Sequence, residues 1–427
     1  MSVANLYRPA SRNAILIVPI RAPATAVECL FYAYLIYAIL GPILGLSIPF
    51  AGAGMLLLLA AACIVSVGLQ GAVLYRSLTL PFAVGISFLV IQLGVHGEPL
   101  RDPMCRAFVT WMLGMMIVQS LSARPGFLHR FTLIMFFIGL VTLPYLGFSG
   151  AGLSVERASI DEAVSGNLAN PNGLAEWFGF CAVYLVILGL ETKHNMLRIG
   201  SWVLGVASLY VVALTVSRGA MLATALALAF ALQHLLKRGF VPILLLIVFT
   251  WIVFESGLFR QMTASYSARA SEETGRFLVW PLALERFVDS PFVGVGASHV
   301  STYVLERGRE YTPHNSFIYL GLVSGILPLG FFIAFCVSLA RSRFSRFDLK
   351  DASFRKSLFI FALMVSVVGD LSFMSPWGLL AFSPGLAALD SYRARRHIRF
   401  GMPLPQAPIS SDRRAPLSGK FAEPKTQ

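Results

Sequence analysis

The sequence predicts an all-α, polytopic integral membrane protein with about 12 transmembrane helices and one long periplasmic loop that carries an amphipathic helix. Three observations predict this class. Hydrophobic residues make up 56% of the 427 residues and charged residues only 13%, whereas a soluble domain has about 25% charged residues. Apolar stretches of roughly 16 to 24 residues, long enough to cross a bilayer as a helix, recur along the chain. The basic residues are distributed as expected of a multi-pass protein.

The predicted spans follow one another with mostly short connections. They cover residues 25–46, 48–69, 78–95, 107–122, 131–148, 173–190, 199–216, 219–236, 239–258, 317–340, 358–373 and 376–391. The connection at Ser217-Arg218-Gly219 is tight, and two outer segments, 149–172 and 258–315, are long.

Lysine and arginine fix the predicted orientation, because cytoplasmic loops carry an excess of them. With a cytoplasmic N-terminus, 24 of the 34 basic residues fall inside, every inside segment has at least one, and both termini are cytoplasmic. The net charge of +13 is then mostly a topology signal. No nucleic-acid partner is expected, since no basic stripe with interleaved aromatic residues occurs. The ten outside cations are all arginine, which reflects either chance or a need for planar groups that bind phosphate or carboxylate.

The long outer segment divides the chain into blocks. These are a nine-span block 1–258, a periplasmic loop 259–315, a three-span block 316–392 and a disordered cytoplasmic tail 393–427. No cleavable signal peptide is predicted, so we expect the whole chain to insert in a bacterial inner membrane, in contact with membrane lipids. The chain has no CxxC or HExxH pattern and no outside acidic cluster with ligand spacing, so neither a metal nor a disulfide framework is expected.

An amphipathic helix is predicted within the periplasmic loop, over residues 276–288. Its spacing places one set of apolar side chains on one side, as in a helix that lies on the membrane surface. The set is Phe277, Trp280, Leu284, Phe287 and Val288. Pro281 lies inside this segment and is compatible with a kink or a restart.

His314 is one of three histidines on the predicted outer side, and it immediately precedes the apolar run that begins at Phe317. Asn315 or Ser316 is able to cap the helix that starts there. A histidine at the water edge of the membrane can exchange a proton near neutral pH. It can equally be a loop residue beside a helix cap.

Two outside arginines are candidates for holding an anion. Arg218 lies at the outer end of a span, where it either snorkels to the head groups or pairs with an anionic group. Arg276 starts the amphipathic helix, where a guanidinium adds to an already positive helix end. That arrangement is unfavourable for folding and useful for binding an anion.

Other outside polar residues are further candidates. Asn170-Pro171-Asn172-Gly173 leads into a span and is either a turn with an N-cap or part of a site. Asp370 lies near the outer end of a span, where a carboxylate is costly without a partner, so it either pairs with Arg218, orients His314 or is hydrated. Glu176 and Glu255 also lie near outer ends and are secondary candidates.

Together these segments resemble the superfamily of O-antigen ligases and polysaccharide polymerases. The residues that carry the resemblance lie between about 165 and 335, in one order along the chain. They are Asn170-Pro171-Asn172 with Leu174-Ala175, Ser217-Arg218-Gly219-Ala220, Gly275-Arg276, Trp280, Ser290-Pro291 with Gly294 and Gly296, His314-Asn315-Ser316, and Gly321 with Gly325. Each motif alone is weak, and the ordered set is more specific.

The resemblance implies an inverting glycosyltransferase that takes a glycan from undecaprenyl diphosphate at the periplasmic face. Arg218 and Arg276 would hold the charge of the leaving diphosphate, and His314 would be a general base toward the acceptor hydroxyl. Asn315, Asn170, Asn172, Asp370 and Trp280 are the expected substrate-binding residues. Neither ATP nor a sugar nucleotide is implied, so no cofactor is expected.

The acceptor stays open at this point. A lipid-linked repeat unit would make the protein a polymerase for exopolysaccharide or O-antigen, which is the preferred interpretation. The lipid A core would make it an O-antigen ligase, and a protein hydroxyl would make it an oligosaccharyltransferase. A transporter or flippase of lipid-linked sugars is a more distant alternative, because the chain shows no obvious repeated halves and its ionisable residues cluster at the outer edge.

Overall fold

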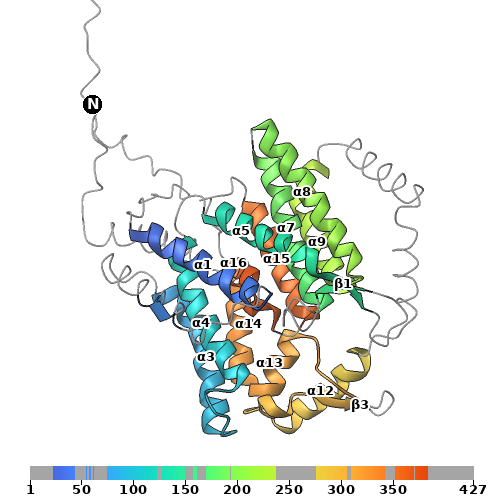
Figure 1. The fold of residues 1–427 in the computed structure, drawn as a ribbon. Helices are drawn as coiled ribbons and strands as arrows, with labels where there is room; N and C mark the ends of the chain where they lie inside the picture. The colour runs from blue at the N-terminus through green and yellow to red at the C-terminus, as the bar shows by residue number, and fades with distance from the viewer. Residues whose placement is uncertain are drawn as a thin grey trace, which may run out of the picture.

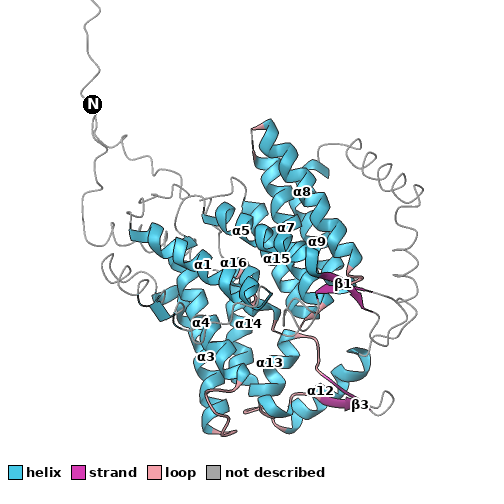
Figure 2. Cartoon of the chain, viewed as in Figure 1, coloured by secondary structure: helices cyan, strands magenta, loops and turns pink. Residues whose placement is uncertain are grey.

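The computed structural model describes residues 23–43, 54, 57–58, 61, 75–122, 127–149, 157–160, 170–192, 194–236, 276–304, 309–341, 352–369 and 371–382. These parts are mostly helical, as the sequence predicted (Figure 1 and Figure 2). The predicted spans 48–69, apart from four isolated residues, and 239–258 lie outside the described residues, as do the tail 393–427, Glu255 and Asp370.

The helices described up to residue 236 overlap with predicted spans. They are α1 Pro23–Ile43, α3 Tyr75–Gly94, α4 Pro103–Ser122, α5 Phe127–Thr142, α7 Pro171–Glu191, α8 Asn195–Leu214 and α9 Arg218–Leu236. The C-terminal part contributes α12 Arg276–Asp289, α13 Ser316–Ser324, α14 Ile326–Arg341, α15 Ala352–Val368 and the short α16 Pro376–Ala381, with the 3-10 turn η5 Ser372–Met374 between the last two.

The helix α7 is the centre of this arrangement. It packs against α8, α9, α5 and α15 (Figure 1), and 89% of its most apolar 18-residue stretch is buried. Phe178, Phe180 and Tyr184 are among its fully buried side chains. A helix that is apolar on nearly all sides is covered by other helices or by lipid. In α7 the neighbouring helices provide most of this cover.

Within the described residues, two helices are long and apolar enough to cross a bilayer: Pro171–Leu190 and Asn195–Leu214. Seven further helices of the described part contain shorter apolar segments, between 10 and 17 residues. The total of about twelve spans therefore stays a prediction.

The predicted span 317–340 is wrong as a single helix. It is divided into α13 and α14 at Gly325, whose φ of 78° ends α13. Left-handed backbone costs little only for glycine. A Cβ at Gly325 would lie 2.2 Å from the carbonyl oxygen of Phe292, so the break is also a point of close backbone contact.

The predicted span 131–148 is also shorter than expected. Helix α5 ends at Thr142, a 3-10 turn η2 Leu143–Tyr145 follows, and β1 Leu146–Ser149 pairs antiparallel with β2 Arg157–Ile160. Pro144 lies in that turn, and a proline cannot donate the backbone hydrogen bond that a continuing helix requires. A second short hairpin pairs β3 Thr302–Val304 with β4 Arg309–Tyr311.

The amphipathic helix is present as α12, and it runs through Pro281 without an end. Its side chains differ in their exposure. Val279 and Ala283 are buried, with Phe287 partly buried, whereas Leu284 and Val288 are 47% and 71% exposed. The exposed Leu284 and Val288 belong to the apolar set that is predicted to lie on the membrane surface, and this placement stays a prediction.

A turn after α12 fastens this segment to the end of α13. The backbone N–H groups of Val295 and Gly296 donate to the carbonyls of Leu322 and Val323, at 2.8 and 3.1 Å. The fully buried amide of Gln92 on α3 completes the contact: its Nε2 donates to Val323 O, and its Oε1 accepts from the N–H of Ala297. The Ser290–Gly296 motif thus has a structural role, which is to hold α13 in place.

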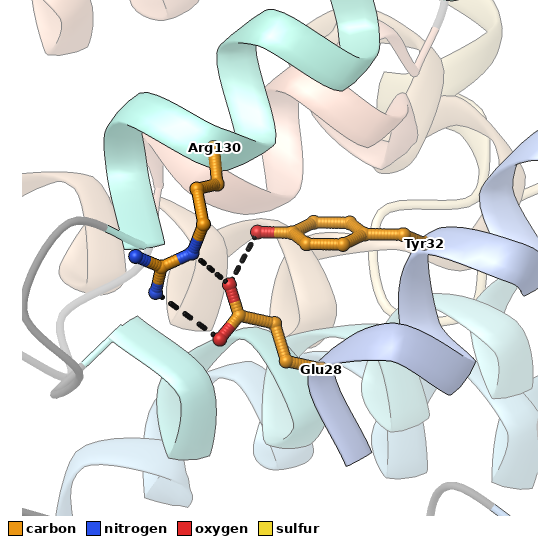
Figure 3. A network of polar contacts seen from close by, with 3 residues as sticks. All are labelled: Glu28, Tyr32 and Arg130. Carbon is orange, nitrogen blue, oxygen red and sulfur yellow. Dashed lines mark hydrogen bonds and ion pairs between the residues drawn. The ribbon is translucent and has the colours of Figure 1, made fainter. Parts of the chain in front are cut away.

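The N-terminal helix α1 is tied to α5 by a polar network (Figure 3). Glu28, 4% exposed, accepts hydrogen bonds from Arg130 Nε at 2.6 Å and from the Tyr32 hydroxyl at 2.7 Å. A buried carboxylate requires such partners. The network fixes α1 beside α5, and the next turns of α1 reach the cavity described below.

Candidate functional site

A cavity of about 760 Å³ lies between α1, α4, α7 and the segment that follows α15. His314, Asn170 and Asn172, three of the predicted site residues, all line it. Glu176 and Ser372 add polar groups to the same wall, and α1 and α4 contribute apolar side chains such as Phe31, Leu35 and Met104. The cavity therefore joins a polar region to an apolar one.

His314 is presented to this cavity by an unusual backbone. Its φ is 49°, in the left-handed region that few residues other than glycine adopt. Directly after it, the buried Asn315 caps α13: its Oδ1 accepts from the N–H groups of Phe317 and Ile318 at 2.9 and 3.2 Å. The prediction of a helix cap at this position is confirmed. The side-chain oxygen of Asn315 is thus engaged in the cap.

The residue before His314 is fixed as well. The Trp280 indole N–H on α12 donates to the carbonyl oxygen of Pro313 at 2.6 Å. Thr312 Oγ1 lies 3.4 Å from His314 Nδ1, at the weak limit of a hydrogen bond. Trp280, predicted to contact substrate, therefore has an observed contact that holds the chain next to His314.

Arg218 is the first residue of α9, and it is half-buried. It is not among the described residues that line the cavity. Its neighbour Ser217 connects it to that cavity, because the Ser217 hydroxyl donates to Asn172 Oδ1 at 2.9 Å. Val216 has a φ of 49°, which is rare for a β-branched residue.

Asn170 and Asn172 have different contacts. Asn170 is exposed and caps α7 by accepting from the N–H of Asn172, with Pro171 in the first helical turn. Asn170 therefore forms the predicted N-cap, and its role toward a substrate stays a prediction. Asn172 accepts from Ser217, so it joins the start of α7 to the start of α9.

Two predicted residues are less completely placed. Arg276 is the first residue of α12, as predicted, so its backbone lies at that helix start. Asp370 lies outside the described residues, but its neighbours Gly369 and Leu371 both line the cavity. The predicted pairing of Asp370 stays a prediction.

Three residues of the site were not predicted from the sequence or were only secondary candidates: Ser372, Ser217 and Glu176. Ser372 donates from its hydroxyl to Glu176 Oε1 at 3.1 Å. Ser217 joins Asn172. The sequence contains one indication of Glu176: it lies four residues after Asn172 on α7, so both residues share one side of that helix. Nothing in the sequence marks Ser372, because its partner is 196 residues away.

The non-glycine residues with positive φ gather around this site. Among the described residues they are Val216, His314 and Leu371, each with a φ of 49°. One precedes α9, one precedes α13, and one precedes η5. Such residues cost about 1–3 kcal/mol each and often mark functional sites. Here His314 and Leu371 line the cavity, and Val216 precedes Ser217, which donates to Asn172.

The chain matches a known family over one segment. Residues 203–333 match the family model described as O-antigen ligase. This segment runs from within α8 to within α14 and contains Arg218, Arg276, Trp280, His314 and Asn315. No curated protein matches the chain. The family is one of membrane proteins of polysaccharide biosynthesis. Residues 203–333 are thus similar to the O-antigen ligase family, and this match supports the resemblance of the chain to the superfamily of O-antigen ligases and polysaccharide polymerases.

Proposed function

We propose that this protein transfers a glycan from undecaprenyl diphosphate to an acceptor hydroxyl at the periplasmic face of the inner membrane, and that it polymerises lipid-linked repeat units. One observation carries the proposal: His314 and Asn172 line a single cavity whose other wall is apolar. A lipid-linked sugar has the same two-sided character, with a hydrocarbon chain joined through a diphosphate to a polar glycan.

In this proposal the donor lies in the cavity in one orientation. The hydrocarbon chain lies against the apolar side chains of α1 and α4, including Phe31 and Leu35. The diphosphate lies toward the starts of α9 and α12, where Arg218 and Arg276 begin the helices. Helix N-termini and guanidinium groups both stabilise anions. The leaving group is already a good one, so stabilising its charge is the main requirement.

The acceptor is activated by His314. The acceptor oxygen attacks the anomeric carbon as the bond from that carbon to the diphosphate oxygen breaks. The electron pair stays on the diphosphate, and the hydroxyl proton passes to the imidazole. Attack from the side opposite the diphosphate inverts the anomeric centre. Asn170 and Asn172 are suited to sugar hydroxyls, because an amide both donates and accepts hydrogen bonds. Trp280 and Asn315 support this step by holding His314, and we keep Asp370 as a candidate partner of Arg218 or His314.

A ligase is the second candidate. In that case the acceptor is a hydroxyl of the lipid A core rather than another repeat unit. The description of the matching family, O-antigen ligase, favours this acceptor. The chemistry at the anomeric carbon and the residues proposed for it are the same in both cases.

The proposal is tested with the purified full-length chain in detergent or lipid nanodiscs. A lipid-diphosphate oligosaccharide is supplied with either repeat units or lipid A core, and the release of undecaprenyl diphosphate is measured. We expect release that depends on one acceptor and is lost in Arg218→Ala and His314→Ala. Full release in both variants would contradict the proposed site, and release with lipid A core alone would identify a ligase.

A further inference from the structure

Glu176 is a buried carboxylate in the cavity wall. Its exposure is 8%, and it lies on α7 one helical turn after Asn172. A charged group in this environment is costly and is seldom retained without a role. Its position in the same cavity as His314 relates it to the proposed site.

Two hydrogen bonds, one at Ser372 and one at Gly369, relate Glu176 to the segment that contains His314. Glu176 Oε1 accepts from the Ser372 hydroxyl at 3.1 Å. Ser372 begins η5, directly after the left-handed residue Leu371. At the other side of this turn, the carbonyl oxygen of Gly369 accepts from the Ser316 hydroxyl at 2.8 Å. Ser316 is the first residue of α13, two residues after His314.

The turn is pressed closely against the carboxylate. A Cβ at Gly369 would lie 2.2 Å from Ser372 Oγ and 2.9 Å from Glu176 Oε1. Only glycine leaves room for this contact. The hydrogen bond between Ser372 and a carboxylate is charge-assisted, which makes it stronger than one between neutral groups. The left-handed conformations of Leu371 and His314 require such support from their surroundings.

We infer that Glu176 is a positioning residue: through Ser372 and the turn at Gly369 it holds the start of α13 so that His314 faces the cavity. This inference rests on the proposed function. Glu176 and Ser372 both lie outside the segment 203–333 that matches the family, so they are contributed by the flanking parts of the chain.

A double-mutant cycle tests this connection. The variants are Glu176→Leu, Ser372→Ala and the two combined, with transfer kinetics measured on the full-length protein. Since small misplacements of a reacting group cost up to about 100-fold in rate, we expect kcat to fall at least about tenfold in each single variant. KM for the donor stays unchanged. The combined variant is no slower than the slower single one, because both remove the same connection. Glu176→Gln, which keeps an oxygen acceptor for Ser372, falls between wild type and Glu176→Leu.

A matched control is available in the same chain. Ser298 donates to Glu98 Oε1 at 2.6 Å, which is the same type of contact at an exposed position. Neither residue lines the cavity. Glu98→Gln and Ser298→Ala should therefore leave kcat unchanged.

A second measurement does not depend on transfer. Diethyl pyrocarbonate acylates imidazole, and mass spectrometry gives the rate at His314 relative to the exposed His194. We expect this ratio to change several-fold in Glu176→Leu and in Ser372→Ala, and to stay constant in Glu98→Gln. Wild-type kcat and labelling in both single variants would overturn the inference. So would a combined variant whose reduction in kcat equals the product of the two single reductions, or a rise in KM with unchanged kcat. If His314→Ala is fully active, the proposed function fails, whereas the labelling ratio still decides whether Glu176 positions His314.

Discussion

Ser217 donates a 2.9 Å hydrogen bond to Asn172 Oδ1, and this contact joins the residue before Arg218 to the wall of the cavity that contains His314. The two residues are 45 positions apart. Ser217 is buried and Asn172 is partly buried, so the contact is shielded from water. It relates two of the predicted motifs that the sequence could only place in order.

Ser217→Ala removes the donor of this contact and leaves Asn172 Oδ1 without it. A lost hydrogen bond to a buried group costs about 1–3 kcal/mol, and Arg218 loses its fixed position relative to the cavity. We expect lower thermal stability and a reduced kcat. Ser338→Ala is the matched control, since the Ser338 hydroxyl donates only within its own helix, to Phe335 O. An equal loss of activity in both variants would show that the Ser217 contact has no special role.

Trp280→Phe keeps an aromatic ring on α12 and removes the N–H that donates to Pro313 O. The hydrogen bond contributes about 1 kcal/mol, so the protein should remain folded. We expect the transfer rate to fall because the segment before His314 is no longer fixed. Unchanged kcat together with an increased KM would instead indicate that Trp280 contacts the substrate directly.

Gly294→Ala and Gly325→Ala test the turn that fastens α12 to α13. Each glycine has positive φ, and a Cβ would lie 2.5 Å from Leu322 O or 2.2 Å from Phe292 O. We expect each variant to lose at least about 1–3 kcal/mol, measured by thermal unfolding in detergent. Gly330→Ala is the control: no atom lies within 4 Å of its Cβ, and it is inside α14. That variant should gain up to about 1 kcal/mol from helix propensity. Equal stability of all three would contradict the close contact.

Arg130→Ala tests the network between α1 and α5. Glu28 would keep Tyr32 but lose both hydrogen bonds from the guanidinium. Because Arg130 is 45% exposed, part of its contribution is screened by solvent. We expect a loss of about 1–3 kcal/mol. Arg101→Ala, at an exposed position, is the control. Equal unfolding temperatures for the two variants would show that the network does not stabilise α1.

The helical class and most helix positions follow from composition and periodicity, because apolar runs of this length have few other solutions. The helix cap at Asn315 and the start of α9 at Arg218 were also predictable, since both depend on local residue types. The break at Gly325 was not, because a glycine inside an apolar run carries no mark of the Phe292 carbonyl that approaches it. The contact of the exposed Leu284 and Val288 of α12 with the membrane surface stays a prediction.

The candidate site was predictable in its members and less so in their roles. His314 and Asn172 were predicted and share one cavity. Trp280 and Asn315 were predicted as substrate contacts, which stays a prediction, and each makes a hydrogen bond that holds the backbone beside His314. Glu176 was ranked low because its partner Ser372 is distant in sequence. Long-range contacts of this kind cannot be read from spacing.

The most direct test of the account uses His314→Asn. Asparagine tolerates the left-handed conformation that residue 314 adopts, so this variant removes the imidazole without requiring a new backbone. Release of undecaprenyl diphosphate is measured with saturating lipid-linked oligosaccharide and acceptor. The account predicts a protein that unfolds at the wild-type temperature and transfers at least about 100-fold more slowly, as expected for loss of a general base. Transfer at the wild-type rate by this folded variant would contradict a catalytic role for His314.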